Sequence, residues 1–189
     1  MKVKFMNSPR KNTESHKVPK ADNKYKPFSR ENENYRIKTS VVMTTQLATH
    51  RADAEIYYGD AICKQKSQDL LDQFFLPRGL LPLNDILEVG YNRTSGFIWL
   101  KQQKKKEHRF PAIGRTVLYD TEVSAFIEER RFRRLTGVKS KEFFLWITVS
   151  EIYVDQQNTS KITFGTSTGI AKSFPVSAFL IEEETDRKK

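Results

Sequence analysis

LPRGLLPLNDILEVGYNRTSGFIWL, residues 76–100, is the stretch of the chain that decides the fold. Pro77 and Gly79 end a helix, because proline cannot continue one and glycine is favoured just past its last turn. Two runs rich in β-branched and aromatic residues follow, Ile86–Tyr91 and Phe97–Lys101, around a five-residue turn that starts with Asn and ends with Gly. The stretch therefore predicts a helix exit followed by the first β-hairpin.

The helix that enters this stretch is predicted over Asp60–Phe75, with Asp60 as its N-cap. Its expected inward stripe has a spacing of four residues and comprises Ile62, Lys66, Leu70 and Phe74. Cys63 lies in the same helix and is the only cysteine of the chain, so no internal disulfide can form. Nothing in the neighbouring sequence would lower its pKa, and we expect a small buried hydrophobe.

Downstream of residue 100 the pattern is that of β-structure. The densest run, Phe143–Val154, reads FFLWITVSEIYV and is longer than an ordinary strand of about 5–6 residues, which predicts a bend or bulge. The other expected strands are Arg115–Tyr119, Glu122–Ile127, Lys161–Phe164, Ile170–Phe174 and Val176–Ile181. One helix followed by about seven strands with short turns predicts an α+β, mainly β fold: an antiparallel barrel or sandwich with the helix packed on it.

Charge divides the chain into two parts. Residues 1–42 hold eleven Lys/Arg and four acidic residues, a net charge of +7, and the remaining residues carry only +3 of the total +10. We therefore expect a basic, disordered arm over 1–42 and one domain over 43–189, without nucleic-acid binding by the folded domain. Alternatives for the arm are a nucleic-acid-binding or nuclear-targeting segment, a transit peptide, and a gene-model extension ahead of Met43.

No apolar run approaches the roughly 20 residues that span a bilayer, and the N-terminus lacks the apolar core of a secretory signal. The sequence therefore predicts an intracellular, cytoplasmic protein without a transmembrane segment, with nuclear targeting by the basic arm as the alternative location.

Candidate catalytic patterns are few. Gly165–Gly169 matches G-x-S-x-G, but it lies between two expected strands, and the last histidine precedes Ser167, so the chain order of a hydrolase triad fails. A hairpin turn explains the glycines instead. The histidines His16, His50 and His108 lack the spacing of metal ligands. No catalytic, cofactor-binding or metal-ligating residue is predicted, and no cofactor.

One basic cluster is a candidate anion-binding site. Arg130, Arg131, Arg133 and Arg134 surround Phe132, which we expect to be exposed in a loop between strands. Guanidinium groups can grip a phosphate, pectic or lipid head-group anion. The alternative is an ordinary solvated loop.

Three segments together resemble a known family. They are LPRGLLPLNDILEVGYNRTSGFIWLKQQKKKEHRF from Leu76, IGRTVLYDTEVSAFIEERRFRRLTGVKSKEFFLWITVSEIYVD from Ile113, and KITFGTSTGIAKSFPVSAFLIEEE from Lys161. They are similar to the plant family called domain of unknown function 538, and the resemblance extends from about Met43 to Glu184. It implies an antiparallel β-barrel with an N-terminal helix, and a link to stress responses and to trichome or epidermal growth. It transfers no catalytic residue.

Three functions follow from the residues and the resemblance. The first is a non-enzymatic β-barrel module that binds an apolar or amphiphilic ligand, with an anionic lipid or polysaccharide surface as partner, because aromatics are 12% of the chain and no catalytic constellation is present. The second is a weak esterase or hydrolase acting on chlorophyll or pectin esters, with Ser167 as nucleophile. The third is a protein-interaction adaptor.

Overall fold

The computed structural model describes residues 47–181, and the predicted basic arm lies outside them. Residues 47–51 are helical and precede the first strand. The elements that follow are β1 (Glu55–Tyr58), α2 (Asp60–Gln73), η1 (Arg78–Leu80), β2 (Ile86–Asn92), β3 (Phe97–Gln102), β4 (Lys106–Phe110), η2 (Pro111–Ile113), β5 (Arg115–Glu128), β6 (Arg131–Glu142), β7 (Leu145–Thr148), β8 (Glu151–Val154), β9 (Lys161–Gly165), β10 (Ala171–Pro175) and η3 (Val176–Phe179), where η denotes a short 3-10 helix.

The described strands form one antiparallel sheet of ten strands in the order β1-β2-β3-β5-β6-β8-β9-β10, with β4 on β5 and β7 on β6. The prediction of a mainly β, antiparallel fold with a helix is confirmed. The hydrogen-bonded order has two ends, β1 and β10, so the sheet is not closed into the predicted barrel. Residues 47–181 form ten strands, whereas about seven were predicted.

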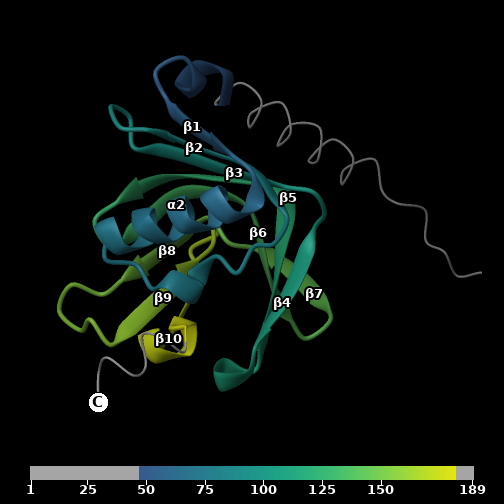
Figure 1. The fold of residues 1–189 in the computed structure, drawn as a ribbon. Coiled ribbons are helices and arrows are strands. Elements are labelled where there is room, and N and C mark those ends of the chain that lie inside the picture. Colours follow the sequence, from purple (N-terminus) through teal and green to yellow (C-terminus); the bar gives the residue numbers. More distant parts are fainter. Residues whose placement is uncertain (1–46, 182–189) are drawn as a thin grey trace, which may run out of the picture.

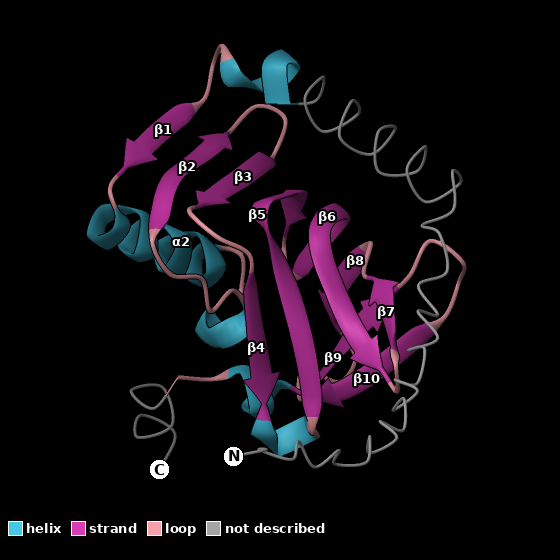
Figure 2. Cartoon of the chain, turned by 90° about the vertical axis from the view of Figure 1, so that its right-hand side faces the viewer, coloured by secondary structure: helices cyan, strands magenta, loops and turns pink. Residues whose placement is uncertain are grey.

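The long hairpin of β5 and β6 carries both halves of the sheet (Figure 2). The C-terminal half of β5 pairs with β3, and its N-terminal half pairs with β4. On the other side, the start of β6 pairs with β8 and its end pairs with β7. One curved pair of strands therefore joins a larger half-sheet, β1–β3 with β8–β10, to a smaller one made of β4, β7 and the far ends of β5 and β6.

Helix α2 lies across the sheet and packs against β1 and β2 (Figure 1). Its buried side chains are Cys63, Ser67 and Leu71, one residue out of phase with the predicted stripe, and Ile62 is exposed. Burial of Cys63 is confirmed, and burial raises the pKa of its thiol. The N-cap is Gly59 and not Asp60, which is the first residue of the helix. Asp60 Oδ1 accepts a hydrogen bond from the Ile86 backbone N–H at 2.9 Å and so ties the helix start to β2.

Five stretches differ from the secondary structure expected of them. Two strands, β1 and β4, form where none was predicted. Arg131–Glu142, expected as a loop, is the strand β6. The run Phe143–Val154 is not one bent strand, since it begins in a turn and continues as β7 and β8. Residues 176–179 form η3 and not a strand, because Pro175 has no N–H with which to continue the ladder.

The space between α2 and the sheet is filled with side chains. A cavity there, next to Leu71, Val89 and Phe132, has a volume of about 10 Å³, room for a single water at most. Buried apolar residues from helix and sheet form one continuous core. This cavity therefore has no room for an organic ligand. No helix within residues 47–181 is long and apolar enough to cross a bilayer.

Candidate ligand-binding site

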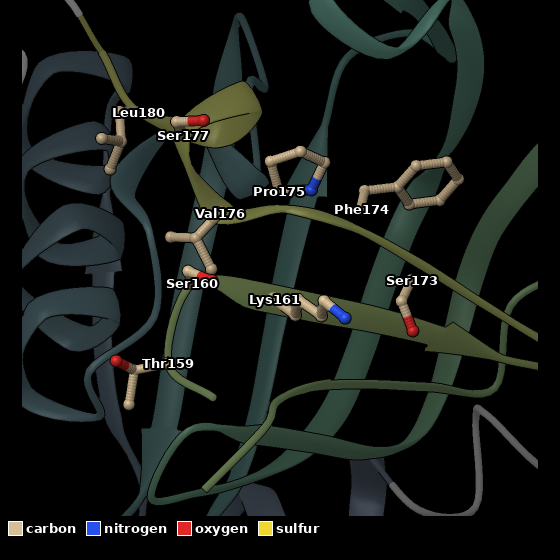
Figure 3. Close-up of a pocket in the computed structure, with 9 residues that line it drawn as sticks. All are labelled: Thr159, Ser160, Lys161, Ser173, Phe174, Pro175, Val176, Ser177 and Leu180. Carbon is tan, nitrogen blue, oxygen red and sulfur yellow. The ribbon is translucent and has the colours of Figure 1, made fainter. Parts of the chain in front are cut away.

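A concavity lies on the surface, at the β10 end of the sheet, and has a volume of about 610 Å³ (Figure 3). Its walls come from the turn before β9, from β9 and β10, and from η3 and the residue after it. The lining residues are Thr159, Ser160, Lys161, Ser173, Phe174, Pro175, Val176, Ser177 and Leu180. A volume of this size accommodates a small organic molecule.

Backbone pairing builds the pocket. Pro175 is the last residue of β10 and lies opposite Lys161, the first residue of β9. The chain then turns into η3, and the Val176 N–H donates to the Ser160 carbonyl at 2.8 Å. This bond holds the start of η3 against the turn before β9, so the two walls of the pocket keep a fixed separation.

The polar side of the pocket consists of hydroxyls and one ammonium group. The Ser160 hydroxyl donates to Asn158 Oδ1 at 2.5 Å, and the Ser173 hydroxyl lies 2.8 Å from that of Thr163. Lys161 is exposed and forms no ion pair with another residue in 47–181. Its charge is therefore available to an anionic ligand group.

The apolar side rests on an aromatic cluster. The half-buried ring of Phe174 packs edge-on against Phe164 at a centroid distance of 5.8 Å, and Phe164 stacks on Phe179 at 5.2 Å. Val176 and Leu180 add apolar surface on the other side of the pocket (Figure 3). The pocket thus offers an apolar surface beside hydroxyls and a cation, an arrangement that suits a molecule with an apolar body and a polar or anionic end.

The predicted arginine cluster lies elsewhere, at the turn between β5 and β6, and its guanidinium groups have separate partners. Arg131 contacts Glu151, and Arg133 Nη1 lies 3.1 Å from Glu128 Oε1. The prediction that Phe132 is exposed is wrong: its side chain points into the core and is 1% exposed.

Aromatic rings take up the remaining faces of these arginines. The guanidinium carbons of Arg130, Arg131 and Arg134 lie 5.6–5.7 Å from the ring centroids of Phe75, Tyr153 and Phe126, respectively. Arg130 Nε also lies 4.0 Å from Glu129 Oε1. The structure thus places the four side chains against three different rings and three carboxylates. Anion binding by Arg130, Arg131, Arg133 and Arg134 stays a prediction.

The G-x-S-x-G segment is the turn between β9 and β10. The Thr166 N–H donates to the Ile170 carbonyl at 2.9 Å, and Ser167 is exposed at the tip. His108 lies on β4, where burial and then the neighbouring Lys106 lower its pKa. His50 stacks on Phe97 with centroids 4.8 Å apart. Within residues 47–181 no three side chains of the His, Cys, Asp and Glu types are grouped to hold a metal ion.

Sequence reasoning missed the pocket because its lining residues are common surface types. Segments 159–161 and 173–177 become neighbours only through the pairing of β9 with β10. The prediction of a strand over Val176–Ile181 also hid the turn at Pro175 that creates the cavity. Pro175, at the junction of the predicted strands Ile170–Phe174 and Val176–Ile181, was the one signal of a break at the sheet edge.

A comparison with protein families found one match: the family model described as "Protein of unknown function, DUF538" matches residues 67–180. The match begins within α2 and ends just after η3, so it includes the whole sheet except β1, and the pocket with it. Searches of curated proteins and of solved structures found no match to the chain.

Proposed function

Since the chain belongs to the DUF538 family, whose description states no activity, we propose its function from the pocket: a surface module that binds an amphiphilic ligand between β9, β10 and η3. The single observation behind the proposal is the contrast between the two cavities. The cavity between α2 and the sheet has no room for an organic molecule, whereas the surface pocket has about 610 Å³.

The composition of the walls supports an amphiphile with an anionic end. Lys161 supplies a positive charge without a partner in the described chain, and the hydroxyls of Ser173 and Ser177 add donors and acceptors. Pro175, Val176 and Leu180 provide apolar contact. A ligand carboxylate or phosphate beside Lys161, with its hydrocarbon part against this wall, would satisfy both sides of the pocket.

The proposal is tested with a fluorescent fatty acid, a probe with a carboxylate and a hydrocarbon chain, titrated into the full chain. Replacing the cation by Lys161→Gln is expected to raise the Kd of the probe about five-fold or more, because a charge-assisted contact contributes on the order of 1 kcal/mol. Narrowing the pocket by Val176→Trp is expected to abolish binding of the probe.

Ser167→Ala is the matched control, because Ser167 is exposed on the adjoining turn but does not line the pocket. It is expected to leave the Kd unchanged. Equal probe binding by wild type, Lys161→Gln and Val176→Trp would overturn the proposal. Ester hydrolysis that is lost in Ser167→Ala would replace it with the esterase alternative.

A further inference from the structure

The turn between β6 and β7 carries the three most exposed large apolar residues of the described chain. Glu142 and Leu145 are paired residues, so Phe143 and Phe144 alone form the turn. Their side chains are 89% and 95% exposed, and Leu145 is 68% exposed. Isolated apolar residues are common on protein surfaces, but three consecutive ones at the tip of a hairpin are not explained by folding.

The backbone of this turn runs against the preference of its residues. Phe143 has φ +54°, a left-handed conformation that two-residue hairpin turns normally give to Asn, Asp or Gly. A bulky residue in the left-handed conformation raises the free energy of the folded state by of order one RT or more. Glycine at the first turn position would suit this backbone better, and a polar residue after it would leave the tip polar. Packing within residues 47–181 therefore does not explain either ring.

The base of the hairpin is anchored. The carboxylate of Glu142 is largely buried, and its Oε2 accepts from Arg115 Nη1 at 2.8 Å and from Lys172 Nζ at 2.5 Å. These bonds tie the end of β6 to the start of β5 and to β10, a strand from the far end of the sheet order. The tip is thus presented on a fixed support.

A basic face lies directly behind the tip. Cross-strand partners share one face of a sheet, and the pairs Lys141 with Trp146 and Lys139 with Thr148 are on the outer face here. Lys139 also pairs with Leu118, which in turn pairs with Glu107, two residues before Arg109. None of the three cations of this face forms an ion pair with another residue in 47–181: Arg109, Lys139 and Lys141.

We propose that the β6–β7 tip docks on an anionic lipid bilayer, with Phe143 and Phe144 inserted at the interface and the cations of the outer face against the head groups. This site is separate from the pocket and does not depend on the ligand proposed there. A convex tip needs no complementary groove when its partner is a bilayer. On the outer face, the three cations Arg109, Lys139 and Lys141 accompany one acid that forms no ion pair in the described chain, Glu107. The resulting positive charge complements negatively charged lipids.

The spacing along the hairpin agrees with this arrangement. A strand rises about 3.3 Å per residue, so Lys141 and Trp146 lie about 7 Å behind the turn. Each polar layer of a bilayer is about 5–7 Å thick, so rings at the hydrocarbon boundary place both residues among the head groups. Trp146, half-exposed with the Lys141 ammonium 5.5 Å from its ring centroid, has the amphipathic character that membrane interfaces favour.

The test uses the full chain with phosphatidylcholine vesicles, with and without phosphatidylserine. Co-sedimentation measures partitioning, and quenching of tryptophan fluorescence by brominated lipid reports insertion. Trp146 is the informative probe because Trp99, the other tryptophan, is 0% exposed. The variant Phe143→Gly/Phe144→Asn places glycine at the residue with positive φ and is expected to keep its melting temperature. It is expected to partition at least about ten-fold more weakly and to lose the quenching.

Phe75→Asn is the matched control, because Phe75 is 63% exposed and also has positive φ, but lies at the end of α2. It is expected to bind like wild type. Lys139→Gln/Lys141→Gln is expected to weaken binding only to vesicles with phosphatidylserine. The basic arm is present in every variant, so it cannot produce these differences. Wild type without lipid quenching, or a tip variant that partitions like wild type, would overturn the proposal and leave a protein partner for the tip.

Discussion

The two tryptophans of the chain show that two regions of the sheet, around β3 and around β7, use aromatic surface differently. Trp99 on β3 is fully buried, donates from Nε1 to Glu88 Oε1 at 2.6 Å, and has the Arg51 guanidinium 5.7 Å from its ring centroid. Trp146 on β7 also has a cation beside its ring but remains partly exposed.

The difference lies in the neighbours of the two rings. Around Trp99 the chain encloses the ring completely, and residues 47–51 are attached to the sheet through the Arg51–Glu88 ion pair at 2.6 Å. Around Trp146 the chain leaves Phe143 and Phe144 in solvent. Aromatic surface therefore stabilises the fold in the first region, and in the second it is available to a partner. The following predictions separate the two uses.

The largest effect is expected from Trp99→Ala. Removing a fully buried indole leaves a cavity and takes one hydrogen bond from Glu88, and we expect the free energy of unfolding to fall by about 3–5 kcal/mol. Urea unfolding followed by circular dichroism measures it. Trp146→Ala is the control and is expected to cost less than about 1 kcal/mol. Equal losses in the two variants would contradict the distinction between the regions.

A somewhat smaller loss is expected from Gly90→Ala. Gly90 lies opposite Trp99, and a Cβ on Gly90 would come within 2.0 Å of the indole Cζ2. The ring would have to move, which in a packed core costs about 1–3 kcal/mol. The same urea titration checks this prediction, and an unchanged midpoint would show that the indole does not cover β2. Gly114→Ala, at a position with open space but positive φ, separates crowding from backbone strain.

Glu88→Gln is expected to lower the free energy of unfolding by about 1–2 kcal/mol at neutral pH. Hydrogen bonds from Arg51 hold the pKa of the Glu88 carboxyl below its usual range, with further help from Trp99. A carboxyl with a depressed folded-state pKa stabilises the fold above its unfolded pKa, about 4.3, and loses this contribution as the pH falls through the folded value. Wild type and variant should therefore converge in acid. A constant difference from neutral to acidic pH would refute this electrostatic explanation.

The smallest effect, and one of opposite sign, is expected from Phe143→Gly. Glycine adopts positive φ without strain, and its gain is partly offset by its greater freedom in the unfolded chain. We expect the free energy of unfolding to rise by up to about 1 kcal/mol, measured by urea titration beside Phe144→Ala as control. A loss of more than about 1 kcal/mol would mean that the Phe143 ring contributes to folding after all.

The helix and the first hairpin could be predicted from the sequence because both are local. Asp60–Gln73 and the pair β2–β3 lie within a residue or two of the expected bounds. Strand β6 could not, because its buried residues Phe132, Leu135 and Val138 are three apart. The irregular pairing of β5 with β6 and the left-handed residues Arg134 and Gly137 break the two-residue alternation that marks a strand.

The turn at Phe143–Phe144 was hidden for a related reason. Its residues have the highest β propensity of any stretch in the chain and none of the usual turn residues, so local preference predicts a continuous strand. Pro175 indicated a break or an edge of the sheet, but whether the sheet closes depends on pairing between distant strands and could not be predicted. The pocket depends on that edge. Neither candidate site could therefore be found from residue types alone.

Hydrogen exchange of the full chain, with and without phosphatidylserine-containing vesicles, tests the central claim most directly. Exchange is followed by mass spectrometry in peptides from the tip, residues 141–148, and from β2–β3, residues 86–102. We expect vesicles to slow exchange in the tip peptides and to leave the β2–β3 peptides, where aromatic surface is already buried, unchanged. Equal protection of both regions, or none at the tip, would contradict the claim that the chain holds its exposed aromatic surface for a membrane.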